Sequence, residues 1–504
     1  MSTVTPLRTA AALPVLSMII RGQVITDHLT EVGGRGGDLR FLTPEVNHYL
    51  ERLPLGNPRR MADLYAISFQ DILDYLVELG QRLDIRRNAH LQWARESTYG
   101  TSPLTPALVD ASYAGLPEWF ARESMTEAAE QSIGIEYLEG WVPRRMLSGA
   151  TVRIRCFGAR CLHIVAGNAP AVSALSILRN ALLRSDAIIK APSNDPFTAW
   201  AIARTMCDMA PDHPVTKHLS VAYWRGGDTA VEQALYQPHH IEKIIAWGGF
   251  ASVRHVTRYI QPGLELISLD PKRSTSIIGA EAFATTGMMQ AAAVRVATDV
   301  GATNQNGCVN ARVVYVLSGT DAAGLAKANA LGQLVYAAML ALPGTVSTRP
   351  KRYNRDLKDL VVSLAMDDEW YRVIGGRDDE GAVIVSQLPE AVNFATALTD
   401  RTVNIVPIDT LDEFLGTVNA YTQTVGVFPE PLKDQLVDQL PLHGAQRIVS
   451  LGYAVTTVGT NAGPHDAIEP MRRMGKWILD EICTPETVAP LWEQGTAGTA
   501  APSA

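Results

Sequence analysis

Cys308 is the residue in this sequence whose surroundings best suit covalent chemistry. It lies in the Gly/Asn-rich segment 304–310, directly before the run 311–316, which is rich in β-branched residues and typical of a buried strand. Such a turn exposes the sulfur and surrounds it with backbone N–H groups that can hold a thiolate. A lone cysteine is more often a buried structural residue, so its neighbours must decide between the two interpretations.

A side-chain amide on a second turn could complete such a site. Asn168 lies in the segment 163–170, where its N–H groups could stabilise an oxyanion. A cysteine with a donor amide is the minimum for acyl transfer through a thioester. On spacing alone, Asn168 before Pro170 could equally be a turn-capping residue.

Length and composition are those of an ordinary multidomain enzyme. The chain has 504 residues, too many for one compact core, so two or three domains are expected. Apolar residues make up 47% and charged residues 19%, and the formal net charge of −8 argues against nucleic acid as a partner. The 5 cysteines include no Cys-x-x-Cys pair, which favours free thiols in a reducing cytoplasm.

We expect no metal site, because His239 and His240 have no third ligand at a useful spacing.

Residues 1–140 predict strands and helices but carry no evident chemistry. The apolar run 15–20 is too short to span a membrane and is interpreted as a strand. Phe69, Ile72, Leu73, Leu76 and Leu79 recur every three or four residues, which predicts a helix. The glycine-rich segment 33–38 does not fit the GxGxxG spacing and is interpreted as a connection.

Between residues 141 and 280, short apolar runs alternate with helical patterns, which predicts βαβ units and a parallel sheet. Ligands bind at the carboxyl ends of the strands in such sheets. The turns after the runs contain Gly167-Asn168, Lys190–Ser193, Gly226–Asp228 and Gly248-Gly249. The expected strands are 162–165, 187–189, 221–224, 244–247 and 276–279, and the expected helices are 171–183, 197–209, 229–236 and 252–260.

A second α/β region, 281–440, contains Cys308. Helices are expected at 288–300 and 322–340, and strands at 313–317, 382–385, 402–407 and 424–428. The last segment, 441–504, is expected to contain a helix over 468–482 and to end in a flexible tail after Trp492.

Six segments of the chain, taken in their sequence order, resemble those of the LuxC-type acyl-CoA reductases, a branch of the aldehyde dehydrogenase superfamily. The resemblance covers about residues 140–480 and is loose before them. One such segment alone would be weak evidence for the family. The resemblance is specific because all six occur in the same order as in the family. The segments are His163–Pro170, Ile188–Ser193, Ala246–Gly249, Asp270–Lys272, the Cys308 turn, and Pro464–Asp466 with Pro470–Arg473.

The resemblance implies an aldehyde dehydrogenase-like α/β fold with a small oligomerisation element. Residues 1–140 would pack on a Rossmann-like NADP(H)-binding domain of 141–280. A catalytic domain of 281–440 and a C-terminal segment of 441–504 would follow. The implied reaction is reduction of an acyl-CoA: a cysteine takes the acyl group, CoA leaves, and NADPH reduces the enzyme thioester to the aldehyde.

Site residues follow from the same resemblance. Cys308 matches the nucleophile, with a pKa expected to be lowered by positive potential or backbone donors, and Asn168 matches the oxyanion-hole amide. His465 would line the substrate or nicotinamide region, although a structural hydrogen bond accounts for it equally well. The implied cofactor-binding residues are Ala166, Gly167, Lys190, Pro192, Ser193, Gly226, Trp247, Gly248, Gly249 and Ser252.

The segment Lys190–Ser193 favours NADPH over NADH. Many NAD-using relatives carry Glu three residues after the superfamily lysine, and its carboxylate binds the ribose hydroxyls but repels a 2′-phosphate. Ser193 stands at that position here, so a 2′-phosphate near Lys190 is accommodated.

The sequence departs from aldehyde-oxidising relatives where their Glu-Leu-Gly-Gly-Lys motif supplies the base for the deacylating water. The corresponding segment is Ser268–Lys272, with Ser268 in the Glu position. Water should then attack the acyl-enzyme poorly, which favours acyl-CoA reduction over oxidation to a free acid. Glu265, three residues upstream, could still serve as a substitute base.

Two other functions stay open on sequence: an NAD(P)-dependent aldehyde dehydrogenase that forms free acid, and a non-redox cysteine acyltransferase or acyl carrier. The series of cofactor turns argues against the second. Arg447 and Arg472-Arg473 are candidates to attract CoA phosphates, or are simply solvated. A homo-oligomer is expected, and an acyl-activating enzyme is a candidate partner. The acyl chain, aliphatic or aromatic, does not follow from the sequence.

Overall fold

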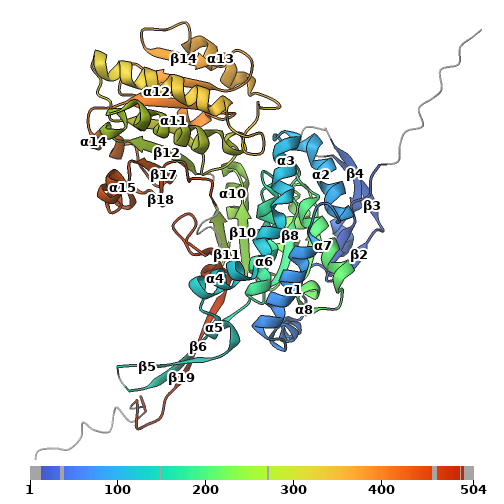
Figure 1. The fold of residues 1–504 in the computed structure, drawn as a ribbon. Helices are drawn as coiled ribbons and strands as arrows, with labels where there is room; N and C mark the ends of the chain where they lie inside the picture. Colours follow the sequence, from blue (N-terminus) through green and yellow to red (C-terminus); the bar gives the residue numbers. More distant parts are fainter. Residues whose placement is uncertain are drawn as a thin grey trace, which may run out of the picture.

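Two α/β bodies and a projecting β arm make up the protein, as the computed structural model shows (Figure 1). The structure describes residues 13–33, 39–147, 149–269, 272–456, 462–488 and 490–492. The glycine-rich segment from residue 34 onward, the pair Asp270-Pro271 and the tail after Trp492 lie outside the described residues.

The first body is a seven-stranded sheet in the order β11-β10-β7-β8-β9-β1-β2. Strands β11 to β9 run parallel, and β1 and β2 add antiparallel strands at one edge. Every residue of β8 and β9 is buried, as expected for parallel strands covered on both faces. The strands are β1 (Met18–Ile20), β2 (Gln23–Ile25), β7 (Arg160–Ile164), β8 (Asp186–Lys190), β9 (Leu219–Ala222), β10 (Lys243–Trp247) and β11 (Glu265–Leu269).

Helices from both the N-terminal region and the βαβ crossovers cover this sheet. α6 (Pro170–Leu182) connects β7 to β8, α7 (Thr198–Met209) lies between β8 and β9, and both share a core with α1 (Phe69–Arg82). The predicted apolar stripe of α1 is buried, and a capping box between Ser68 and Asp71 begins the helix. The other helices are α2 (Ala89–Thr101), α3 (Pro106–Ala114), α4 (Arg122–Ser132), α5 (Ile135–Glu139), α8 (Pro214–Lys217), α9 (Thr229–Leu235) and α10 (Phe250–Val256), with 3-10 turns η1 (Val46–Tyr49), η2 (Pro58–Tyr65), η3 (Leu116–Phe120) and η4 (Thr257–Tyr259). A hairpin of β3 (Leu29–Gly33) and β4 (Arg40–Pro44) was not predicted.

The second body is a seven-stranded sheet in the order β14-β15-β16-β13-β12-β17-β18, parallel except for β14. α11 (Thr286–Gly301) and α12 (Ala322–Leu340) share one apolar core with it, and α14 (Leu411–Leu415), α15 (Glu430–Leu436) and α16 (Gln439–His443) share another. The strands are β12 (Arg273–Ile278), β13 (Ala311–Val316), β14 (Tyr371–Gly375), β15 (Ala382–Ser386), β16 (Thr402–Pro407), β17 (Thr422–Phe428) and β18 (Arg447–Ser450). This body also contains α13 (Arg355–Leu364), η5 (Ala280–Phe283), η6 (Ala302–Gln305) and η7 (Ala395–Ala397).

The segment 276–279, expected in the cofactor-binding region, instead belongs to the second sheet. β12 pairs in parallel with β13 and β17. The chain leaves the first sheet after Leu269, and the alternation of strands and helices continues without a break in its pattern. Periodicity predicts a strand correctly here but carries no information about which sheet receives it.

A three-stranded antiparallel sheet, hereafter the arm, projects from the first body (Figure 1). It consists of β5 (Val142–Arg145), β6 (Thr151–Phe157) and β19 (Lys476–Ile482). The predicted helix over 468–482 is therefore wrong: α17 (Pro470–Met474) ends at Gly475, and β19 pairs with β6 along its whole length. A Cβ at Gly475 would lie 2.5 Å from Cys156 Sγ, so this close approach requires glycine.

Candidate active site

The backbone before Cys308 has an uncommon conformation that buried side chains hold in place. Residues 303–305 have φ of 50°, 52° and 61°, in the left-handed region that non-glycine residues rarely adopt. Residues in this region cost about 1–3 kcal/mol each and persist where their surroundings determine them. The Gln305 side chain donates to the Thr402 carbonyl and accepts from the Thr402 N–H, both at 2.9 Å. These bonds fix the turn against β16 and thereby place Cys308.

Cys308 is half-buried, just before β13, and Ser274 Oγ donates to its carbonyl oxygen at 2.7 Å. Burial raises the pKa of the thiol above its ordinary value. A hydrogen bond from Gln423 and the charge of Arg312 act in the opposite direction, and the charge of Asp466 adds to the rise. The expected net lowering of this pKa is wrong for this structure, because burial outweighs the donors.

The structure brings Asn168 to the Cys308 turn. Asn168 Nδ2 donates to the carbonyl oxygen of Asn306 at 3.3 Å, two residues before the cysteine. Since Asn168 follows β7 and the cysteine precedes β13, this bond joins the two bodies. The N-cap of α6 is Ala169 rather than Asn168. A side-chain amide has two N–H donors and this bond uses one, which leaves the other for a substrate oxygen.

His465 lies beside the end of β10, with its ring centre 5.5 Å from that of Trp247. The backbone N–H of His465 donates to the Ile468 carbonyl at 2.8 Å, and the backbone N–H of Ile468 donates to the His465 carbonyl at 3.1 Å. Burial lowers the pKa of His465, and the neighbouring Asp466 carboxylate opposes this effect. The segment from residue 465 to 468 is thus a tight turn that closes over the edge of the first sheet near the cysteine.

Glu265 cannot replace the missing base. It begins β11, and Ser268 lies near the opposite end of the same strand. Burial alone would raise the pKa of Glu265, but hydrogen bonds from Lys243 and Arg473, both at 2.7 Å, hold it below its ordinary value. A carboxylate with two cationic partners is a poor proton acceptor, so the structure removes the substitute that the sequence left open.

The arginines suggested for CoA phosphates already have partners in the protein. Arg473 binds Glu265, and Arg447 donates to the Ala454 carbonyl at 2.7 Å. The Arg472 guanidinium carbon lies 4.3 Å from the centre of the Trp477 ring. These contacts account for all three residues as structural groups.

The residues implied for the cofactor gather at the carboxyl edge of the first sheet. A Cβ at Gly226 or Gly249 would meet no atom within 4 Å, so both turns border open space. At Gly167 a Cβ would lie 2.3 Å from Asn194 Oδ1, so a larger residue there would displace the Asn194 side chain. Ala166 and Gly167 follow β7, Lys190 ends β8 before Pro192 and Ser193, Gly226 follows β9, and Trp247 ends β10 before Gly248, Gly249 and Ser252.

Lys190 offers a cation at this edge. Burial lowers its pKa to about 8, and the charge of Glu232 opposes the shift. Its Nζ lies 5.4 Å from the centre of the Trp224 ring. A buried ammonium beside open glycine turns suits a phosphate group, so the residues present fit a nicotinamide dinucleotide.

Sequence reasoning missed Glu232, a buried carboxylate in α9. It accepts from the Gly227 N–H at 3.1 Å and the Tyr259 hydroxyl at 3.0 Å, and it pairs with His255 Nε2 at 2.5 Å. Its partners lie in the turn after β9, in α10 and in η4, so Glu232 ties two of the cofactor turns together. A glutamate within a predicted helix carries no signal of this role.

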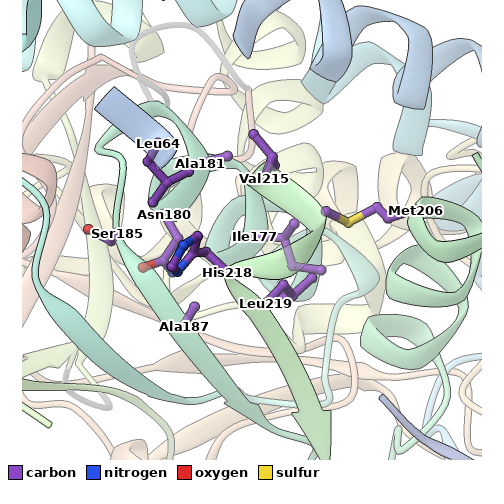
Figure 2. Close-up of a pocket in the computed structure, with 10 residues that line it drawn as sticks. All are labelled: Leu64, Ile177, Asn180, Ala181, Ser185, Ala187, Met206, Val215, His218 and Leu219. Carbon is purple, nitrogen blue, oxygen red and sulfur yellow. The ribbon is translucent and has the colours of Figure 1, made fainter. Parts of the chain in front are cut away.

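Two cavities lie away from the cysteine. A small void of about 10 Å³, roughly the room of one water, is lined by Leu64, Ile177, Asn180, Ala181, Ser185, Ala187, Met206, Val215, His218 and Leu219 (Figure 2). A larger cavity of about 600 Å³ lies at the root of the arm, and its lining includes Tyr65, Trp141, Phe157, Arg160 and Lys476. Neither lining contains a residue implied for catalysis or cofactor binding.

Within the described ranges, no group of three or more His, Cys, Asp or Glu side chains is placed to hold a metal ion. No helix in that same part of the chain combines the length and apolarity needed to cross a membrane. All five cysteines are free, and Cys483 is exposed.

Comparisons with known proteins point to one family. A family model described as acyl-CoA reductase (LuxC) matches residues 64–477. The long-chain acyl-protein thioester reductase of Aliivibrio fischeri is 27% identical over 83% of this chain and 84% of that protein. That of Vibrio harveyi is 24% identical over 92% of this chain and 93% of that protein.

Solved structures show the fold. The structure of lactaldehyde dehydrogenase from Escherichia coli matches with a TM-score of 0.69 and 13% identity, over 93% of this chain and 100% of that one. The structure of Mycobacterium tuberculosis aldehyde dehydrogenase complexed with NAD+ matches with a TM-score of 0.68 and 15% identity, over 94% of this chain and 99% of that one. The fold is therefore that of the aldehyde dehydrogenases, and the match over most of its length shows that the chain belongs to the acyl-CoA reductase (LuxC) family.

Proposed function

We propose that this protein reduces an acyl thioester to the aldehyde with NADPH, through a covalent acyl group on Cys308. The proposal is carried by the Asn168 amide, which reaches the Cys308 turn from the other body and bonds the Asn306 carbonyl at 3.3 Å. Acyl transfer requires a nucleophile with an oxyanion donor beside it. Relatives named long-chain acyl-protein thioester reductases support a thioester as the substrate.

In the first step the Cys308 thiolate attacks the carbonyl carbon of the thioester. The carbonyl oxygen becomes an oxyanion, to which Asn168 Nδ2 and the Cys308 backbone N–H donate. Collapse of this adduct breaks the bond between the carbon and the donor sulfur, so the donor leaves as a thiolate and the acyl group stays on Cys308. The departing thiolate takes up the one proton that the overall reaction consumes.

In the second step the same donors serve the Cys308 thioester. When bound at the carboxyl edge of the first sheet, NADPH would supply the hydride that the carbonyl carbon of this thioester receives. The oxyanion forms again beside Asn168, and its collapse expels the Cys308 thiolate and releases the aldehyde. Neither step needs an activated water, which agrees with Ser268 at the Glu position and with a Glu265 that is held by two cations.

NADPH is proposed rather than NADH because of the residues at the end of β8. Ser193 leaves the edge without the carboxylate that would repel a 2′-phosphate, and Lys190 lies three residues away. A phosphate would satisfy the buried Lys190 ammonium directly.

The acyl donor is proposed to be a long-chain acyl-CoA. The names of the relatives suggest an acyl group carried by a protein thiol as the other source. Both sources present the same thioester carbonyl to Cys308, and the second requires an acyl-activating enzyme as a partner.

We also propose a cytoplasmic homo-oligomer held together by the arm. Five free cysteines suit a reducing compartment. Exposed apolar side chains gather on the arm, as expected of a surface that a second subunit covers. They are Met146, Leu147, Ile478, Leu479 and Ile482.

The test is NADPH oxidation, followed by absorbance, across acetyl-, octanoyl-, palmitoyl- and benzoyl-CoA and a palmitoylated carrier protein. The proposal expects oxidation with one equivalent of free thiol released per aldehyde formed, and the most active donor identifies the substrate class. NADP+-dependent release of free acid from an aldehyde, with no thioester reduction, would instead establish the aldehyde-oxidising alternative.

A further inference from the structure

Asn310 is a buried amide that lies two residues after Cys308 and directly before β13. It is 0% exposed. Its Oδ1 accepts from the Gly307 N–H at 2.8 Å, and its Nδ2 donates to the carbonyl oxygens of Asp299 at 2.9 Å and Ala302 at 3.1 Å. A buried amide costs free energy unless it is hydrogen-bonded, and this one has a donor for its oxygen and two carbonyls for its two N–H groups.

These partners fix the orientation of the Asn310 amide. With oxygen and nitrogen exchanged, the side-chain N–H groups would face the Gly307 N–H, and the side-chain oxygen would face two carbonyl oxygens. Asp299 lies in the last turn of α11, where backbone carbonyls have no partner within the helix. Since α11 belongs to the apolar core of the second body, Asn310 is anchored to a packed element.

The Asn306 carbonyl and the Gly307 N–H belong to one peptide group, and two amides hold its opposite ends. Asn168 Nδ2 donates to the carbonyl oxygen at 3.3 Å, and Asn310 Oδ1 accepts from the N–H at 2.8 Å. In a trans peptide the C=O and the N–H point in opposite directions within one plane, so rotation of this plane would break both bonds. Asn310 therefore holds the group to which Asn168 is bound.

We propose that Asn310 is a positioning residue for the oxyanion site. It fixes the peptide between Asn306 and Gly307, and through that peptide it fixes the Asn168 amide. The inference rests on the proposed function, because it takes Asn168 as the donor to the oxyanion. A preorganised donor needs no reorganisation when the charge develops, so an Asn168 amide without a fixed partner stabilises the oxyanion less.

Two reactions of Cys308 separate this role from general support of the turn. Acylation by p-nitrophenyl acetate passes through an oxyanion and releases nitrophenolate, whereas alkylation by iodoacetamide displaces iodide and forms no oxyanion. In a Cys483→Ser background, we expect Asn310→Ala to slow acylation at least about tenfold and alkylation less than about threefold. Equal losses in the two reactions would mean that Asn310 only supports the turn, and they would overturn the inference.

A double-mutant cycle tests whether Asn310 acts through Asn168. In an Asn168→Ala background the peptide no longer holds a side-chain amide. Asn310→Ala should therefore slow acylation by a much smaller factor than it does with Asn168 present. The same factor in both backgrounds contradicts a role through Asn168.

Gly307→Ala perturbs the same contact and keeps every buried amide, so it replaces Asn310→Ala if that variant does not fold. The new Cβ would lie 2.9 Å from Asn310 Oδ1, which displaces the amide from the peptide N–H, and acylation should again slow more than alkylation. In Gly344→Ala, the matched control, a Cβ would meet no atom within 4 Å, so neither rate should change. Unchanged acylation in Gly307→Ala overturns the inference.

The same assay distinguishes failure of the proposed function from failure of the inference. Nitrophenolate release by Cys308→Ala at the rate of the wild type would refute Cys308 as the nucleophile. With acylation confirmed at Cys308, the ratio of the acylation rate to the alkylation rate tests Asn310 without NADPH or a thioester substrate.

Discussion

At the scale of single residues, the proposed site combines residues from both bodies. Asn168 follows a strand of the first sheet and bonds the turn of Cys308, which belongs to the second. The proposed nucleophile and its proposed oxyanion donor therefore share no local segment, and only the docking of the two sheets brings them together.

Removal of the Asn168 amide should slow acylation and hydride transfer alike. We expect Asn168→Ala to lower kcat by about 10²–10³-fold, because the oxyanion loses one donor in both steps. The measurement is single-turnover aldehyde formation, with NADPH affinity determined separately by fluorescence. Asn329→Ala, which removes an amide paired with Gln387 in the second body, is the control. A loss of less than threefold in Asn168→Ala would contradict the assignment.

The preference for NADPH should depend on the residue at position 193. Ser193→Glu places a carboxylate where the 2′-phosphate is proposed to bind, so the ratio of kcat/KM for NADPH to that for NADH should fall by at least about tenfold. Ser193→Ala removes the hydroxyl without adding charge and should change the ratio far less. Equal ratios in the glutamate variant and the wild type would mean that the 2′-phosphate binds elsewhere.

The residue types at the site could be predicted, and their electrostatics could not. Cys308 and Asn168 stand in segments whose composition and order resemble a known family. The pKa of the thiol depends on burial and on Gln423 and Asp466, which approach from distant parts of the chain. A sequence shows neither burial nor long-range approach, so the predicted direction of this shift was wrong.

At the scale of elements, strands and helices were predicted well where local patterns decide them. The expected helix at 322–340 and the expected strand at 402–407 have the observed bounds of α12 and β16. The helix expected over 468–482 fails because pairing with β6 decides the structure of β19. Tertiary pairing of this kind overrides local propensity.

The start of β19 should be intolerant of even a methyl group. Gly475→Ala would place a Cβ 2.5 Å from Cys156 Sγ. We expect the free energy of unfolding to fall by about 1–3 kcal/mol, measured by urea denaturation. In Gly100→Ala, within α2, a Cβ would meet no atom within 4 Å, so stability should be unchanged or higher. Equal stability of Gly475→Ala and the wild type would contradict the close packing at the root of the arm.

At the scale of the whole molecule, the arm is the proposed contact between subunits. It projects from the first body (Figure 1), and it exposes Ile478, Leu479 and Ile482 by 41%, 52% and 42%. An oligomerisation element is an expectation from the family resemblance, and the arm is proposed to be that element. Sequence patterns could not locate it, because strands distant in sequence form the arm and its outer surface is defined only once they pair.

Assembly should therefore respond to charge on the arm. We expect Leu479→Asp to reduce the mass measured by multi-angle light scattering, because a carboxylate resists burial at a subunit interface. Met366→Asp adds the same charge at a position that is 86% exposed outside the arm and should leave the mass unchanged. An unchanged mass in Leu479→Asp, with the wild type oligomeric, would place the interface elsewhere.

The most direct test of the account is to trap the acyl group on the enzyme. The protein is incubated with palmitoyl-CoA in the absence of NADPH, digested, and analysed by mass spectrometry. We predict a palmitoyl adduct on the peptide that contains Cys308, absent in Cys308→Ala, retained in Cys483→Ala, and discharged as hexadecanal when NADPH is added. An acyl-enzyme that forms on Cys483 alone, or an adduct on Cys308 that NADPH does not discharge, would contradict the covalent reductive mechanism.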